Sequence, residues 1–204
     1  MLTRTRAFAA IVSMIVATPQ AFAQRGPNAD PNWPCQQIKT PTFSLAAIWS
    51  GPPVDLGSQA WRDDPRVADL EGKMTERRVP VEEVEKAIAD FRAHEGAAAN
   101  AKLLQAFGAA FEDLTAQRSQ ILTGLDRFGA RQRELAGRIR AESEAVETSA
   151  DARKDESEDF LEQKLQWDLR VYEDRRKTIG YVCESPTLIE QRLGAIARAV
   201  QQAL

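Results

Sequence analysis

Histidine and cysteine, the residues that build most metal sites and many catalytic centres, are nearly absent from this sequence. The 204 residues include one histidine and two cysteines. A zinc site draws three or four ligands mainly from these two residue types, so the chain cannot assemble one if its cysteines pair with each other. The sequence also lacks a glycine-rich phosphate loop. We therefore predict a protein without a metal site built on histidine or cysteine, without a cofactor and without catalytic activity.

Two further absences restrict the partners of the chain. The formal net charge is -3, whereas proteins that bind nucleic acid usually present a strongly basic surface. No stretch after the N-terminal region is apolar enough for a membrane helix, which needs about 20 consecutive apolar residues. We expect no nucleic-acid partner and no membrane span in the mature chain.

Residues 1–23 have the pattern of a secretory signal peptide. Two arginines precede the apolar stretch 7–17, and Ala21 and Ala23 provide the small-x-small pattern of a cleavage site. The alanine- and arginine-rich composition fits a bacterium, so we predict a periplasmic protein. An uncleaved N-terminal anchor is the alternative. The periplasm is oxidising, which favours disulfide bonds.

Residues 24–64 are rich in proline and tryptophan. Proline fixes φ and removes a hydrogen-bond donor, so regular secondary structure is not expected here. The large apolar residues in this stretch distinguish it from a disordered linker. We predict an irregular strap that packs on a larger body. Its tryptophans either anchor the strap or line a ligand groove: Trp33, Trp49 and Trp61.

Residues 65–204 are expected to form one helical domain. Asp64 followed by Pro65 is a favourable helix start, and Pro80 precedes a second amphipathic stretch that Gly96 should end. His94, the single histidine, lies in the last turn of that stretch, where a structural role is the simplest interpretation.

A heptad pattern dominates the middle of this domain. Apolar residues recur at alternating steps of three and four from Leu104 to Ile139, interrupted by Arg118 and Gln132, which could set a register or lie near solvent. The pattern predicts a long helix in a coiled-coil-like pairing. Glycines within it each cost about 1 kcal/mol relative to alanine: Gly108, Gly124, Gly129 and Gly137.

A return helix is predicted after a charged stretch. Apolar residues resume a helical pattern at Phe160, and Pro186 is expected to break the helix before a last segment begins. A turn near residue 150 would then give two arms of similar length. We therefore predict an all-α fold whose centre is a long antiparallel helical hairpin, coiled-coil-like, with shorter packed helices and the irregular N-terminal strap.

The same symmetry predicts a disulfide. If position 150-x faces position 150+x, Cys183 lies near residue 117, on the packed part of the hairpin. Its only possible partner within the chain is Cys35, in the strap. The chain-entropy description of such a cross-link gives about 5 kcal/mol for a loop of this size.

The turn end of the predicted hairpin is acidic, since residues 140–159 contain eight acids and three bases. A solvated tip, a docking surface for a basic partner and a cation site are the three interpretations, although the spacing of a calcium-binding loop is missing. The candidate partner or cation residues are Glu147, Asp151, Asp155, Glu156, Glu158 and Asp159.

A long hairpin exposes much surface for its volume, which favours interaction over catalysis. We predict a structural, adaptor or chaperone-like periplasmic protein that binds a protein partner or associates with itself. The alternative is a periplasmic binding module that captures a cation or small ligand through the acidic tip or the Pro/Trp-rich strap.

Overall fold

The computed structural model describes residues 30–149 and 156–204. This part is mostly helical and contains no strand. The predicted signal peptide and the predicted turn near residue 150 lie outside the described residues. The α-helices are α1 (Pro65–Thr75), α2 (Val81–Glu95), α3 (Ala99–Ser149) and α4 (Glu156–Ala203). Short 3-10 helices are η1 (Leu45–Ala47), η2 (Ala60–Asp63) and η3 (Gly96–Ala98).

The predicted ends of the two short helices are confirmed. The Asp64 carboxylate accepts a hydrogen bond from the backbone N–H of Arg66, and Pro65 is the first residue of α1. Pro80 directly precedes α2, and Gly96 follows it with a φ of 53°. That φ lies in the left-handed region that glycine adopts without steric cost, so the chain can turn there and enter α3.

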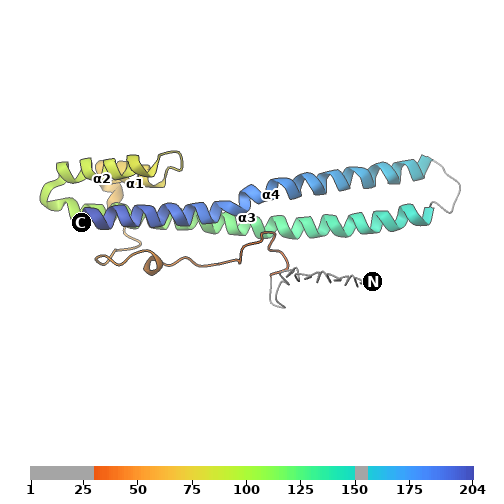
Figure 1. Cartoon of the computed structure of the whole chain (residues 1–204), viewed down its shortest axis with the longest axis horizontal. Helices are drawn as coiled ribbons and strands as arrows, with labels where there is room; N and C mark the ends of the chain where they lie inside the picture. Colours follow the sequence, from red (N-terminus) through yellow and green to blue (C-terminus); the bar gives the residue numbers. More distant parts are fainter. Residues whose placement is uncertain (1–29, 150–155) are drawn as a thin grey trace, which may run out of the picture.

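The helices α3 and α4 lie side by side over most of their length (Figure 1). Arg118 Nε donates to Glu190 at 2.6 Å, and Gln132 Nε2 donates to the carbonyl oxygen of Tyr172 at 3.0 Å. These pairs occur in reverse order along the two helices, which therefore run in opposite directions.

The register of this pairing differs from the prediction by one to two helical turns. Folding about residue 150 would place Arg118 opposite residue 182, whereas it contacts Glu190. Likewise, Cys183 packs with Leu122 and Leu125 rather than with residue 117. The prediction assumed arms of equal length, but the register is set by the side chains that must be buried together.

The main hydrophobic core lies at one end of the helix pair, where α1 and α2 pack on α3 and α4 (Figure 1). Its fully buried members include Leu70, Ile88, Phe107 and Leu193. The N-terminal segment, residues 30–64, adds partly buried apolar side chains to it. We call this end of the molecule the core end.

The other end contains only the two long helices. We call residues 134–149 of α3 and 156–178 of α4 the outer arm; among the described residues no third element covers it (Figure 1). Leu135 is fully buried there, but most apolar side chains of α4 in this part are only partly covered.

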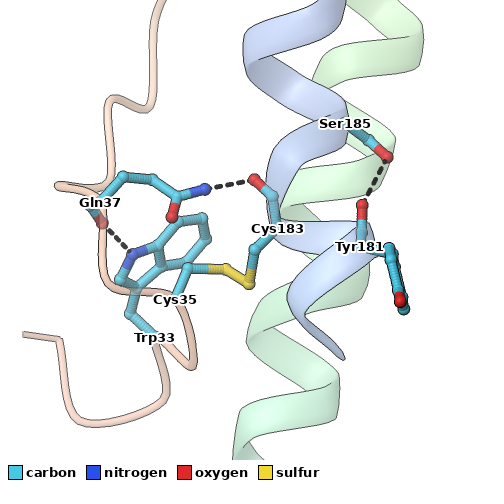
Figure 2. The surroundings of a disulfide bond; sticks show 6 residues. All are labelled: Trp33, Cys35, Gln37, Tyr181, Cys183 and Ser185. Atoms are coloured by element: carbon cyan, nitrogen blue, oxygen red, sulfur yellow. Dashed lines mark hydrogen bonds between the residues drawn. A yellow bond between two sulfur atoms is a disulfide. The ribbon is translucent and has the colours of Figure 1, made fainter. Parts of the chain in front are cut away.

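The predicted break at Pro186 is wrong, because α4 continues through it. Proline lacks the N–H that would donate to a carbonyl one turn earlier. The carbonyl that loses this donor is that of Val182, and the carbonyls on either side of it accept additional hydrogen bonds (Figure 2): Ser185 Oγ donates to the carbonyl oxygen of Tyr181, and Gln37 Nε2 donates to that of Cys183. Packing on both sides of Pro186, which is itself buried, keeps the helix continuous.

Candidate functional site

The predicted disulfide between Cys35 and Cys183 is confirmed (Figure 2). It joins the N-terminal segment to α4 across a sequence separation of 148 residues, with the two Cα atoms 5.6 Å apart. Trp33 is buried in the same cluster, and its indole Nε1 donates to the carbonyl oxygen of Gln37 at 2.6 Å. The segment around Cys35 is therefore fixed both covalently and by packing.

A lysine joins this segment to α3. Lys39 Nζ lies 2.7 Å from Asp30 and 2.8 Å from Asp126 of α3. Its hydrogen bond to Asp126, together with the one to Asp30, raises the pKa of the Lys39 ammonium. The same contact with Lys39, followed by the backbone N–H of Asn32, lowers the pKa of Asp30. Both shifts favour the charged forms of Lys39 and Asp30.

Two of the four glycines in the heptad stretch are places where the N-terminal segment approaches α3 closely. A Cβ atom on Gly129 would lie 1.7 Å from the carbonyl oxygen of Asn32. One on Gly108 would lie 2.9 Å from a methyl group of Val54, whereas at Gly124 nothing lies within 4 Å. Sequence reasoning counted these glycines only as a cost to the helix, because the approaching backbone is not visible in the heptad pattern.

Arg118, which interrupts the heptad pattern, is fully buried between three elements. It pairs with Glu190 of α4, and its Nη2 donates to the carbonyl oxygen of Thr40 at 2.6 Å. The guanidinium group also lies 5.8 Å from the ring centroid of Phe43. A buried charge is tolerated only with such partners, so Arg118 holds the N-terminal segment and α4 together on α3.

The structure places the three predicted tryptophans in two different clusters. Trp33 lies beside the disulfide. Trp49 packs on Phe107 of α3, with ring centroids 4.5 Å apart. Trp61 also lies against the main core, with the Arg62 guanidinium 4.5 Å from its ring centroid. In this arrangement each indole anchors its own part of the N-terminal segment, and the three do not face one another.

The acidic residues of the predicted tip fall mostly outside the part of the chain whose side chains are described. Glu147 and Asp159 are exposed at the ends of α3 and α4. The other four candidates, Asp151, Asp155, Glu156 and Glu158, are not described at side-chain level. Elsewhere in the described residues no group of three or more histidine, cysteine, aspartate and glutamate side chains is placed to hold a metal ion.

A surface hollow of about 860 Å³ lies between α1 and α2. Charged side chains of both signs line it, so it has no clear preference for a ligand of one charge: Arg66, Asp69, Lys73, Glu83, Lys86 and Asp90. His94 is at its edge, and its Nδ1 donates to the carbonyl oxygen of Asp90 at 2.8 Å. That local hydrogen bond fits a structural role for His94.

A row of large apolar side chains lies exposed along α4. Their exposed fractions are 65% for Phe160, 62% for Trp167, 78% for Tyr181 and 50% for Leu188. We call these four residues the outer stripe. Sequence reasoning assigned Phe160 and Trp167 to the general apolar pattern of the return helix. The signal that identifies the stripe is the constant spacing of seven residues, in which Asp174 occupies the middle position between Trp167 and Tyr181.

No helix in the described ranges combines the length and apolar character that a membrane crossing requires. Comparisons of the chain with family models, with curated proteins and with solved structures found no match.

Proposed function

We propose that this chain is a periplasmic interaction protein, a structural, adaptor or chaperone-like component without catalytic activity that binds other proteins through its outer arm. The observation that carries this proposal is that α3 and α4 are covered by other segments at one end and uncovered at the other. Their core-end halves pack under α1, α2 and the N-terminal segment, whereas the outer arm is uncovered and presents Phe160 and Trp167 to solvent, at the start of a row of exposed apolar side chains that continues along α4 to Leu188. Exposed apolar surface beyond isolated residues is typical of interaction sites.

The proposed architecture is an antiparallel, coiled-coil-like hairpin clamped by a strap. The reverse order of the contacts between α3 and α4 supports the hairpin. The Cys35–Cys183 disulfide and the buried Arg118 support a strap that is fixed to both helices. A helix pair of this length acts as a stiff projection, because α3 alone would extend about 75 Å at 1.5 Å per residue.

The proposed compartment follows from two features. Disulfides persist in oxidising compartments such as the periplasm, and this chain has one that joins distant segments. The first 23 residues have the composition of a cleavable export signal. Mass analysis of the exported chain tests this part, since cleavage after Ala23 removes those residues and a retained anchor leaves them in place.

Site-specific photo-crosslinking in the source cell tests the binding proposal. A photo-reactive amino acid replaces Glu134 of α3 or Gln163 of α4, both exposed on the outer arm, and Glu85 of α2 serves as an exposed control at the core end. We expect adducts with a different protein at the outer-arm positions and none at Glu85. Adducts at Glu85 alone, or none at either outer-arm position, would refute binding through the outer arm.

A further inference from the structure

The outer stripe faces away from α3. Half-buried side chains of α4 toward α3 include Leu165, Tyr172 and Ile179, which themselves repeat every seven residues. Residues two positions after these, such as Trp167 and Tyr181, lie about 200° further around the helix. In a helix that pairs only with α3, this outward side is expected to be polar. The outer stripe is therefore a second apolar face on the same helix.

The geometry of the stripe suits a second helix. Phe160 and Trp167 are about 10 Å apart along the axis, as are Tyr181 and Leu188, and Trp167 is about 21 Å from Tyr181 at 1.5 Å per residue. The whole stripe, from Phe160 to Leu188, is about 42 Å long. A strict seven-residue repeat stays aligned with a partner when two helices wind gently around each other. In Figure 2, Tyr181 points away from Cys35 and the N-terminal segment, in agreement with its exposed fraction of 78%.

We propose that the outer stripe pairs with the outer stripe of a second copy of this chain, antiparallel, about a two-fold axis at Asp174. This inference deepens the proposed function of the outer arm by naming one partner. The stripe is symmetric about Asp174, since Trp167 and Tyr181 are equally distant from it, as are Phe160 and Leu188. The axis thus places each large side chain opposite another large one, as an isologous dimer requires.

The charges beside the stripe favour the antiparallel arrangement over a parallel one. Lys164 pairs with Glu142 of α3 and so does not face the second copy, but the two-fold axis places Glu173 opposite Arg175 of the second copy on each side of the stripe. The two Asp174 carboxylates face each other at the axis, and each is offset by Lys177 of its own copy, whose Nζ lies 3.8 Å from it. A parallel pair would place each of these residues opposite its own copy, so that like charges would face one another at every position.

The apolar area is sufficient for a dimer of moderate affinity. A large aromatic side chain has about 150–250 Å² of surface to bury. On this scale, the exposed surface of the four stripe side chains adds up to roughly 500 Å² per copy. Flanking polar side chains bring this closer to the roughly 800 Å² per partner of a standard specific interface. We therefore expect dissociation in the micromolar range.

The first test measures the mass of the full chain, with its disulfide formed, from about 1 to 100 μM by analytical ultracentrifugation, the range that a micromolar dissociation constant requires. Trp167→Ser and Tyr181→Ser should each raise the dimer dissociation constant at least tenfold. Leu169→Ser is the matched control: Leu169 is an exposed apolar residue of the same helix but lies off the stripe, so the dimer should persist. Circular dichroism and melting confirm that each variant is folded.

The second test reads the register from electron spin labels attached singly at two exposed or partly exposed positions. A label at Glu173, beside the proposed axis, should give a short distance between copies. A label at Glu162 should give a distance of at least about 36 Å, because the axis places residue 162 opposite residue 186. Two short distances would indicate a parallel pair and overturn the proposal.

Other outcomes also separate this inference from the proposed function. A monomer at every concentration, a dimer unaffected by both stripe substitutions, or a dimer equally weakened by Leu169→Ser would overturn the stripe pairing. Adducts with a different protein at Gln163 would leave the proposed function intact in those cases. A stable stripe dimer without such adducts would instead limit the outer arm to self-association.

Discussion

Gly129→Ala should destabilise the protein, whereas Gly124→Ala in the same helix should stabilise it. Both glycines lie inside α3, within two turns of each other. A Cβ on Gly129 would lie 1.7 Å from the carbonyl oxygen and 2.7 Å from the carbonyl carbon of Asn32, while one on Gly124 meets nothing within 4 Å. The pair therefore separates the effect of helix propensity from the effect of contact with the N-terminal segment.

The magnitude follows from two terms. Replacing glycine by alanine inside a helix stabilises it by about 0.5–1 kcal/mol, and this term is common to both variants. At Gly129 the Asn32 backbone must move by more than about 1 Å to restore a normal contact, but the nearby disulfide at Cys35 and the buried Trp33 restrain it. Overpacking of this kind costs about 1–3 kcal/mol, which is the expected difference between the two variants.

Chemical and thermal unfolding of the full chain, with its disulfide formed, measure this difference. For a protein of this size, 1 kcal/mol corresponds to about 2–4 °C in Tm, so Gly129→Ala should melt several degrees below Gly124→Ala. Hydrogen exchange at residues 30–37 should be faster in Gly129→Ala alone. Equal stabilisation by both substitutions would show that the N-terminal segment does not rest on Gly129, and the reasoning would fail.

Two further predictions concern the disulfide and a buried carboxyl group. Replacing Cys35 and Cys183 together by serine should lower the free energy of unfolding by up to about 5 kcal/mol; an unchanged urea midpoint would contradict this. Burial, followed by repulsion from Asp113, raises the pKa of Glu71. The stability that this shift contributes is present below the ordinary carboxyl pKa and is lost as pH rises through the raised pKa. Glu71→Gln should therefore raise Tm at pH 7 but not near pH 4, and a lower Tm at pH 7 would argue against a buried carboxylate.

The helix boundaries at the core end were predictable because they depend on local chemistry. An aspartate before a proline caps a helix whatever packs on it, and a glycine can adopt the positive φ that ends one. Asp64, Pro65 and Gly96 play these roles in the structure. The disulfide was predictable for a different reason, since two cysteines allow one intramolecular pairing.

The register and the close contacts were not predictable, because they depend on which side chains are buried together in space. The sequence pattern shows that Arg118 interrupts the heptad seam, but not that Glu190, Thr40 and Phe43 converge on it. Similarly, the effect of Pro186 depends on its surroundings. A proline inside an isolated helix would end or kink it, whereas α4 is held on both sides of this residue.

The outer stripe was visible in the sequence but merged with a second pattern. Apolar residues that face α3 and residues of the stripe share the seven-residue repeat and are offset by two positions, as with Leu165 and Trp167. Read together, they resemble one broad apolar face. Only their exposure in the structure separates them, because the sequence does not distinguish a half-buried apolar residue from an exposed one.

The position of the disulfide along the helix pair explains why local opening of the outer arm should not spread to the main core. The contact between α3 and α4 is weaker where the outer arm begins: Gln132 donates to the Tyr172 carbonyl, but its side-chain oxygen is buried without a hydrogen-bond partner among the described residues. Local opening is therefore expected to begin there. Cys183 and the buried Arg118 stand between this region and the main core, and each connects three segments of the chain. Because separating the helices past this point requires these connections to break together, opening of the outer arm should stop at the disulfide.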